Sequence, residues 1–268
     1  MTEGSTIHCY DRHAAAYDLY QATVVPEYEN AIETTALIVE RLLGRAPQVL
    51  DLGCGTGNAS AAILRRSPGA KVFLLDGSAT MLEAAKAKID GISPSAVTGG
   101  KVADISVHGW SLGLGSGEFD AVVSTLVLEH LDFESYRAAI GTCFHLLRPG
   151  GWLIAAEGYA EEESDMVGWF SELMEARREL IDDPELSDFV SGLREKEEVH
   201  HYASKAEKAA WWREAGFDRV HLLWQYLSLA LMAGQRPVSF WPRTSPSLIS
   251  RKPFSSRNNR VDIARSGC

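Results

Sequence analysis

Apolar residues along the chain follow two alternating patterns. Short continuous apolar runs, typical of buried strands, alternate with segments in which apolar residues recur every three or four positions, typical of helices. Strands are expected at 48–52, 71–76, 96–102, 119–124 and 152–157, and helices at 26–43, 58–66, 78–89 and 136–147. Strands that alternate with helices form βαβ units. We therefore expect an α/β, Rossmann-like fold whose parallel sheet has helices on both faces.

The pattern changes after the fifth expected strand. Residues 158–215 are helical in pattern and rich in acids, with an apolar stripe at Trp169, Phe170, Leu173 and Met174. We interpret this segment as a helical lid, inserted before two closing strands within 217–232. The resulting domain hypothesis is an N-terminal helical cap at 1–45, a main domain at 46–234 that contains the lid, and a basic tail at 235–268. The tail is rich in proline and serine and lacks periodicity, so we expect it to be disordered.

Composition places the chain among ordinary globular proteins. It has 268 residues, of which 46% are hydrophobic and 23% are charged. It has no apolar run of membrane-spanning length, and its first residues lack the charged and apolar regions of a secretory signal. Its four cysteines form no CxxC pair, which argues against a zinc site and fits a reducing compartment. We therefore expect no metal, no membrane partner and a cytoplasmic location.

Charge is distributed unevenly. The whole chain carries a formal −10, yet residues 235–268 hold seven basic residues and one acid, or +6. Residues 1–234 therefore carry −16. An acidic body argues against nucleic acid as a partner, because nucleic-acid interfaces are basic.

The sequence Asp51-Leu-Gly-Cys-Gly-Thr-Gly-Asn58 lies between an expected strand and an expected helix. Glycines at such a turn allow the backbone to approach a ligand closely. A dinucleotide fingerprint would need glycine at Asn58 or at Ser60, so the turn does not match it. The Asp51 carboxylate would repel a pyrophosphate but suits a cation. S-adenosylmethionine carries a sulfonium and an ammonium group and no phosphate, so the turn favours it over a nicotinamide dinucleotide.

Acidic residues also end the next two strands. Asp76 follows Gly57 by nineteen residues and ends the second strand, where a carboxylate can accept hydrogen bonds from both ribose hydroxyls of an adenosine. Asp104 follows the third strand and could accept from an adenine amine. Each aspartate alone could be a helix cap or a turn residue. Three at successive strand ends beside the glycine turn indicate an adenosine-containing ligand.

With these motifs, the chain resembles the class I S-adenosylmethionine-dependent methyltransferases. The matching segments cover roughly residues 10–157, and they are Asp51–Gly57, Leu75–Ser78 with Met81, Ala103–Ile105, Phe119–Asp120 and Leu147–Gly151. The resemblance implies a seven-stranded sheet whose last strand is antiparallel. It also implies S-adenosyl-L-methionine as the cofactor.

A closer resemblance is to the branch that includes carboxy-S-adenosylmethionine synthases, which have a Val-Pro-x-Tyr stretch like Val25–Tyr28. The resemblance implies that the cofactor is contacted by Tyr28, Gly53, Cys54, Gly55, Asp76, Gly77, Met81, Asp104, Ile105 and Thr125. The charge argument adds Asp51 to these contacts. The synthases have Ser-Leu-Gly where this chain has Gly55-Thr56-Gly57, and a lid arginine, near Arg194 here, binds their extra carboxylate. These differences favour plain methyl transfer to an unidentified, small-molecule acceptor. A synthase-like enzyme, a non-catalytic cofactor-binding protein and a homodimer stay open.

Methyl transfer is an in-line displacement, and it needs a general base only when the acceptor must lose a proton. Two residues are candidates for that base. Glu157 ends the fifth strand, and His130 follows the fourth. For each, a structural role is the alternative: Glu157 as a hydrogen-bond acceptor and His130 packed against a helix.

Overall fold

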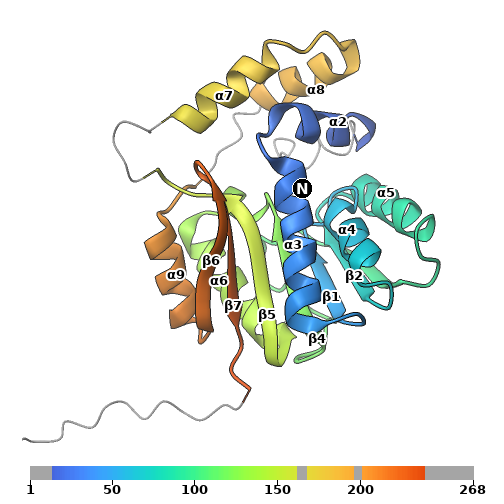
Figure 1. Cartoon of the computed structure of the whole chain (residues 1–268), viewed down its shortest axis with the longest axis vertical. Coiled ribbons are helices and arrows are strands. Elements are labelled where there is room, and N and C mark those ends of the chain that lie inside the picture. Colours follow the sequence, from blue (N-terminus) through green and yellow to red (C-terminus); the bar gives the residue numbers. More distant parts are fainter. Residues whose placement is uncertain (1–13, 162–167, 196–200, 239–268) are drawn as a thin grey trace, which may run out of the picture.

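A single seven-stranded sheet forms the centre of the molecule in the computed structural model (Figure 1), which describes residues 14–161, 168–195 and 201–238. The strand order is β3-β2-β1-β4-β5-β7-β6. The strands are β1 (Gln48–Leu52), β2 (Lys71–Asp76), β3 (Val97–Val102), β4 (Phe119–Thr125), β5 (Leu147–Gly158), β6 (Asp218–Tyr226) and β7 (Leu229–Gln235). Strands β1 to β5 are parallel, and β7 runs antiparallel to both β5 and β6. The expected α/β fold with an antiparallel last strand is confirmed.

Helices cover both faces of this sheet. Helices α3, α4 and α5 pack on one face, and their apolar side chains share a core with β1, β2 and β4. Helices α6 and α9 cover the other face (Figure 1). Tyr136 and Trp212 are fully buried there. The five helices are α3 (Tyr28–Leu43), α4 (Asn58–Arg66), α5 (Ala79–Asp90), α6 (Phe133–Leu146) and α9 (Lys205–Glu214).

Three further helices lie above the carboxyl edge of the sheet and form what we call the cap: α2 (Ala14–Val24), α7 (Trp169–Arg178) and α8 (Pro184–Glu195) (Figure 1). They share a small core of their own, in which the rings of Tyr20 and Phe189 meet edge to face at 5.1 Å. The Arg178 guanidinium donates to the Tyr20 hydroxyl at 2.8 Å and joins α7 to α2. The cap therefore combines an N-terminal helix with part of the expected lid.

The structure distributes the expected cap and lid differently from the sequence hypothesis. The expected cap at 1–45 contains α3, and the expected lid at 158–215 contains α9, yet both helices pack on the sheet. Helix α2 lies within the expected cap, but no separate helix was predicted at its residues. Helix α3 begins at Tyr28 rather than at Pro26, because Glu27 has a left-handed backbone (φ 62°) that interrupts the helical path from α2.

The end of the main domain also lies further along the chain than residue 234. Strand β7 extends to Gln235, which pairs with Trp152 of β5. The Arg236 backbone bonds to Gly150 and Gly151, and its guanidinium donates to the carbonyls of Phe144, His145 and Leu147. Arg236 thus belongs to the folded body and not to the tail. The remaining expected tail, 239–268, lies outside the described residues.

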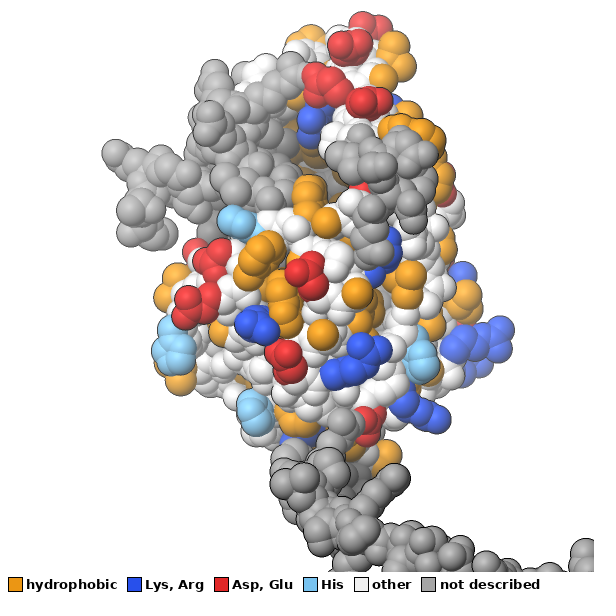
Figure 2. Space-filling view, turned by 90° about the vertical axis from the view of Figure 1, so that its left-hand side faces the viewer, with side chains coloured by type: hydrophobic (Ala, Val, Ile, Leu, Met, Phe, Trp, Pro, Cys, Tyr) orange, Lys and Arg blue, Asp and Glu red, His pale blue; other side chains and the backbone are white. Residues whose placement is uncertain are grey.

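The surface carries charges of both signs. On the face shown in Figure 2, basic and acidic side chains are interspersed over the body, and acidic side chains gather at the top, over the cap. This face shows no continuous basic stripe of the kind that binds a nucleic-acid backbone. Within the described part of the chain, none of the helices has the length and apolar character needed to cross a membrane.

Candidate functional site

The glycine turn after β1 adopts a conformation that other residues would strain. Gly53, Gly55 and Gly57 have φ values of 71°, 51° and 86°, in the left-handed region that glycine enters without cost. A Cβ at Gly53 would lie 2.4 Å from a methyl group of Val127. The sheet order reverses between β1 and β4, and parallel sheets bind ligands at the carboxyl ends of the strands at such a point. The turn therefore lies where a cofactor is expected.

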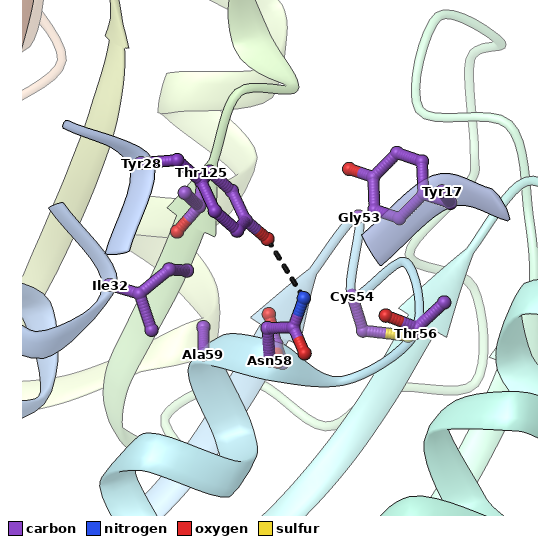
Figure 3. A pocket seen from close by; sticks show the side chains of 10 residues that line it. Tyr17, Tyr28, Ile32, Gly53, Cys54, Thr56, Asn58, Ala59 and Thr125 are labelled. Atoms are coloured by element: carbon purple, nitrogen blue, oxygen red, sulfur yellow. Dashed lines mark hydrogen bonds between the residues drawn. The ribbon is translucent and has the colours of Figure 1, made fainter. Parts of the chain in front are cut away.

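A pocket opens beside this turn (Figure 3). Its lining comprises Tyr17, Tyr28, Ile32, Asp51, Gly53, Cys54, Thr56, Asn58, Ala59 and Thr125. The structure thus brings together five residues predicted from the sequence, namely Tyr28, Asp51, Gly53, Cys54 and Thr125. Gly55 adjoins them, because a Cβ built on it would lie 3.4 Å from the Tyr17 ring.

Asp51 supplies the acidic group of this pocket. Its carboxylate is buried and accepts a hydrogen bond from the Ser60 hydroxyl at 2.5 Å. Burial raises the pKa of Asp51 to about 6, against the lowering effect of the bonds from Ser60. A buried carboxylate that lacks a cationic partner gains from a bound cation. This electrostatic setting suits the ammonium or sulfonium group of S-adenosylmethionine.

Asp76 lies on the other side of the turn. Its two carboxylate oxygens accept hydrogen bonds from the backbone N–H groups of Gly55, at 2.8 Å, and Ser78, at 2.9 Å. Ser78 in turn caps α5 by accepting from the Met81 N–H. The carboxylate is therefore held at the end of β2, directly against the glycine turn. Carboxylate oxygens accept more than one bond each, so capacity remains for ribose hydroxyls.

Four other predicted contact residues lie outside the pocket lining. Gly77 precedes the Ser78 cap, and Met81 is buried in α5. The Asp104 carboxylate accepts from the N–H and hydroxyl of Ser106 and closes a turn after β3. Ile105 packs against the core on the α6 side of the sheet. Their roles stay predictions.

The pocket offers polar groups that fit the amino-acid end of the cofactor. The Thr125 hydroxyl is buried and has no hydrogen-bond partner among the described residues. A buried hydroxyl without a partner is costly, so a bound polar group would satisfy it. With the Asp51 carboxylate and the Tyr28 hydroxyl beside it, the lining can bind an ammonium and a carboxylate at once. The residues present therefore fit S-adenosylmethionine.

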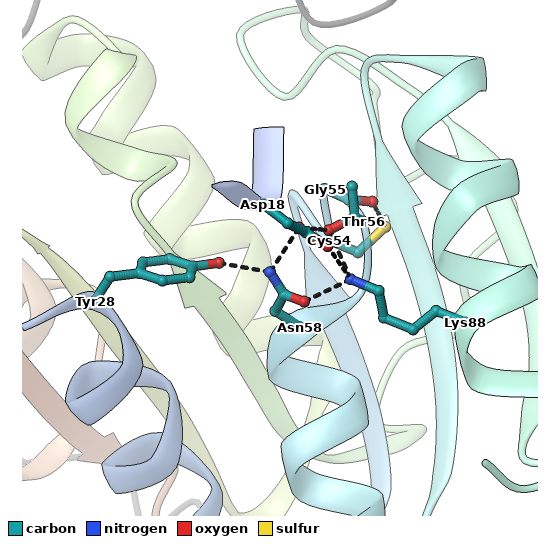
Figure 4. Close-up of polar contacts among 7 residues, drawn as sticks. All are labelled: Asp18, Tyr28, Cys54, Gly55, Thr56, Asn58 and Lys88. Atoms are coloured by element: carbon teal, nitrogen blue, oxygen red, sulfur yellow. Dashed lines mark hydrogen bonds and ion pairs between the residues drawn. The ribbon is translucent and has the colours of Figure 1, made fainter. Parts of the chain in front are cut away.

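Sequence reasoning missed a polar network that joins the cap to the pocket (Figure 4). The Asp18 carboxylate of α2 accepts from the Thr56 hydroxyl, from the Asn58 amide at 2.9 Å and from the Lys88 ammonium at 2.6 Å. Tyr17, its neighbour, lies over the glycine turn, and burial raises the pKa of its hydroxyl. One sequence signal could have indicated the helix that carries Asp18, namely the helical spacing of Tyr17, Tyr20, Gln21 and Val24.

The expected base Glu157 occupies a closed structural arrangement. Its buried carboxylate accepts from the Lys208 ammonium at 2.6 Å, the Tyr136 hydroxyl at 2.8 Å and the Tyr159 hydroxyl at 3.3 Å. Neither Glu157 nor His130 is part of the pocket lining. A carboxylate already paired with an ammonium and two hydroxyls is poorly suited to accept a proton from a substrate. The arrangement favours the structural alternative for Glu157.

Glu129, which precedes His130, is a second buried carboxyl in this region. Burial raises its pKa to about 7, and the nearby Glu157 adds to the increase while His130 and Lys208 oppose it. One of its oxygens has no partner among the described residues. Within these residues, no group of three or more His, Cys, Asp or Glu side chains is arranged to hold a metal ion.

Comparison with known proteins agrees with this geometry. The model of a methyltransferase domain family matches residues 49–151, which span β1 to the start of β5 and include the glycine turn, Asp76 and Asp104. The matched domain, the fold and the turn support one class, the class I S-adenosylmethionine-dependent methyltransferases.

Two relatives of this chain share one name. The chain is 26% identical over 227 residues to the carboxy-S-adenosyl-L-methionine synthase of Klebsiella pneumoniae (strain 342). This match covers 78% of this chain and 82% of that protein. It is 30% identical over 172 residues to the synthase of the same name from Aeromonas salmonicida (strain A449), with 62% and 66% covered.

Solved structures support the fold. The 1,6-didemethyltoxoflavin-N1-methyltransferase of Burkholderia thailandensis, solved with bound 1,6-didemethyltoxoflavin and S-adenosylhomocysteine, has a TM-score of 0.55 to this chain. The two share 17% identity, and the match covers 88% of this chain and 93% of that one. At this identity the likeness concerns the arrangement of the sheet and helices.

Proposed function

We propose that this chain transfers the methyl group of S-adenosylmethionine to a small-molecule acceptor. The observation that carries the proposal is the pocket at the β1–β4 switch point. There the Asp51 carboxylate and the Thr125 hydroxyl, which has no hydrogen-bond partner among the described residues, line the same space. We assign cofactor binding to the predicted residues around it and to Asp76. Gly77, Met81, Asp104 and Ile105 stay in the proposal as contacts to the adenosine end.

The charge of the pocket favours plain S-adenosylmethionine over its carboxylated form. No lysine or arginine is among the residues that line it, and its charged member is acidic. An extra carboxylate there would lack a cationic partner and would lie near Asp51, which is unfavourable. The expected lid arginine, Arg194, has a side chain outside the described part of the structure. We therefore keep carboxy-cofactor synthesis as the second candidate, supported by the named relatives.

The bound cofactor supplies an electrophilic methyl group, and the protein must orient the acceptor and exclude water. The cap lies over the carboxyl edge of the sheet, where it can shield that reaction. Tyr28, Ile32 and Ala59 give the pocket apolar wall area. Because Glu157 is held by Lys208 and two tyrosines, we infer that the acceptor either needs no general base or uses another group, with His130 the remaining predicted one.

Isothermal titration with S-adenosylhomocysteine tests the cofactor site. We expect binding at micromolar concentrations, and Asp76→Ala should abolish it by removing the acceptor of the ribose hydroxyls. Absence of binding at tens of micromolar would contradict the proposal. An Asp76→Ala variant with unchanged affinity would contradict the ribose role alone.

Product analysis separates the catalytic alternatives. Incubation with S-adenosylmethionine and prephenate should leave the cofactor without an added carboxylate, as judged by mass spectrometry. Formation of the carboxylated product would favour the synthase reading. A fluorescence titration with NAD(P)H should show no binding, and a panel of small-molecule acceptors would distinguish a catalyst from a protein that only binds the cofactor.

Assembly and location complete the proposal. We infer a cytoplasmic enzyme from the absence of paired cysteines in the sequence, and we keep a homodimer as an open assembly. Nucleic acid is not proposed as acceptor, because residues 1–234 are strongly acidic. Size-exclusion chromatography with light scattering would measure the number of chains per particle.

A further inference from the structure

The orientation of the Asn58 side-chain amide is determined by its charged neighbours (Figure 4). Its oxygen lies 2.6 Å from the Lys88 ammonium, which can only donate, and its nitrogen lies 2.9 Å from the Asp18 carboxylate, which can only accept. A flipped amide would bring two donors together and two acceptors together. The network therefore leaves one orientation for Asn58.

This orientation has a consequence for Tyr28. The Asn58 amide nitrogen also lies 3.0 Å from the Tyr28 hydroxyl oxygen and donates a hydrogen bond to it. Burial raises the pKa of the Tyr28 hydroxyl, so the group keeps its proton. The described residues offer no acceptor for that proton, and the side chain lines the pocket (Figure 3). The Tyr28 hydroxyl is thus an unused donor at the pocket.

We propose that Asn58, oriented by Lys88 and Asp18, is a positioning residue that makes Tyr28 an obligatory hydrogen-bond donor to the carboxylate of the cofactor's amino-acid end. The inference rests on the proposed cofactor site. A donor to a carboxylate is the complement of Asp51, which receives the cation. Asp51 and Tyr28 would then bind the two opposite charges of the same amino-acid group.

The partners of Asn58 come from elements that are distant in sequence. Asp18 lies on α2 of the cap and Lys88 on α5, and their ion pair is partly exposed, with 43% and 29% of the two side chains accessible. Partly exposed ion pairs contribute little to stability, so the network is better explained by what it orients. A dinucleotide fingerprint that starts at Gly53 would have glycine at its sixth position. Here that position is Asn58, which orients Tyr28.

A double-mutant cycle tests this role, with dissociation constants measured by isothermal titration. Tyr28→Phe should weaken S-adenosylhomocysteine about tenfold, because it removes a bond to a charged group. Asn58→Leu should weaken it about fivefold, because Tyr28 then loses the donor that turns its own proton toward the pocket. Lys88→Met should weaken it about threefold, because the amide then keeps only one of the two charged neighbours that orient it. When Tyr28→Phe is already present, either second substitution should change affinity by less than about twofold.

A second ligand identifies the group that Tyr28 contacts. 5′-Methylthioadenosine shares the adenosine and sulfur of S-adenosylhomocysteine but lacks the amino-acid end. Its affinity should be the same for wild type, Tyr28→Phe and Asn58→Leu. The matched control is Glu33→Gln, which removes an exposed ion pair between α3 and α4 without touching Asn58, and it should bind both ligands like wild type.

The outcomes separate this inference from the proposed function. Wild type that does not bind S-adenosylhomocysteine would overturn both. Two outcomes would overturn only the role of Asn58. One is that the losses of affinity for S-adenosylhomocysteine multiply in the double variants. The other is that the variants lose equal affinity for S-adenosylhomocysteine and 5′-methylthioadenosine. Thermal unfolding identifies a variant that fails to fold, and the Lys88→Met cycle then decides the question, because Lys88 does not contact Tyr28.

Discussion

Asp51 and Glu157 occupy equivalent places in the sheet and have opposite surroundings. Each is the next-to-last residue of its strand, β1 or β5, and each has a carboxylate that is 1% exposed. Glu157 is paired with the Lys208 ammonium, whereas Asp51 accepts hydrogen bonds from Ser60 and has no ion pair among the described residues. The Glu157 carboxylate is neutralised inside the protein, and the Asp51 carboxylate is the one that we propose receives a cation from the ligand. Partners, and not position in the strand, decide which carboxylate is available to a ligand.

The largest effect is expected at the paired carboxylate. Lys208→Met would leave Glu157 buried without a positive charge, and we expect a loss of about 3–5 kcal/mol in the free energy of unfolding. Urea denaturation measures it. The double variant Glu157→Gln with Lys208→Met should recover most of the loss, because no charge then remains buried. A loss below about 1 kcal/mol for the single variant would contradict the structural role.

The unpaired carboxylate should affect binding instead of stability. Asp51→Asn keeps the shape of the side chain but removes its charge, and we expect about thirtyfold weaker S-adenosylhomocysteine binding, or about 2 kcal/mol. The free energy of unfolding should stay the same or rise, because a buried carboxylate is costly. An Asp51→Asn variant that is less stable but binds S-adenosylhomocysteine normally would show that Asp51, like Glu157, has a structural role.

The pH dependence of binding should report the same group. Asp51 has a pKa of about 6 in the folded protein, so its charged form declines below that pH. Between pH 7 and pH 5 the affinity for S-adenosylhomocysteine should fall by about tenfold in wild type. Titrations of Asp51→Asn should lose most of this dependence. An equal slope in both proteins would place the titrating group elsewhere.

The smallest expected effect is a change in the free energy of unfolding at Glu129 that depends on pH. Its pKa is raised to about 7, so the folded state holds its proton more tightly than the unfolded state does. Stability from this group is therefore present below its ordinary pKa and is lost as pH rises toward 7. Glu129→Gln should stabilise the protein at pH 8 by about 1 kcal/mol and change it little at pH 5, as measured by urea denaturation. Equal effects at both pH values would contradict the shifted pKa.

Much of the fold could be predicted because the determining signals are local. The bounds of β1, β2 and α4 follow directly from an apolar run, its flanking glycines and prolines, and the apolar spacing. The glycine turn and Asp76 are adjacent to those elements, so their placement followed. Helix α2 was missed because it is only weakly amphipathic and its apolar side packs on α8, which is far away in sequence.

Part of the pocket lining was predicted for the same reason. Tyr28, Asp51 and Thr125 lie at strand or helix ends that meet at one edge of the sheet, which the parallel topology requires. Glu157 also ends a strand, but its ammonium partner comes from α9, 51 residues later. No local pattern marks such a partner, so the sequence could not show that this carboxylate was already neutralised.

The sequence by itself therefore determined the alternation of strands and helices, the glycine turn and the acids at the strand ends. Only the tertiary structure decided which polar groups are satisfied. Asp18 and Lys88 are 70 residues apart, and they meet at Asn58 because α2 and α5 pack beside the turn. Hydrogen bonds act over about 3 Å, so their partners depend on how distant segments pack rather than on the residues next to them in the chain.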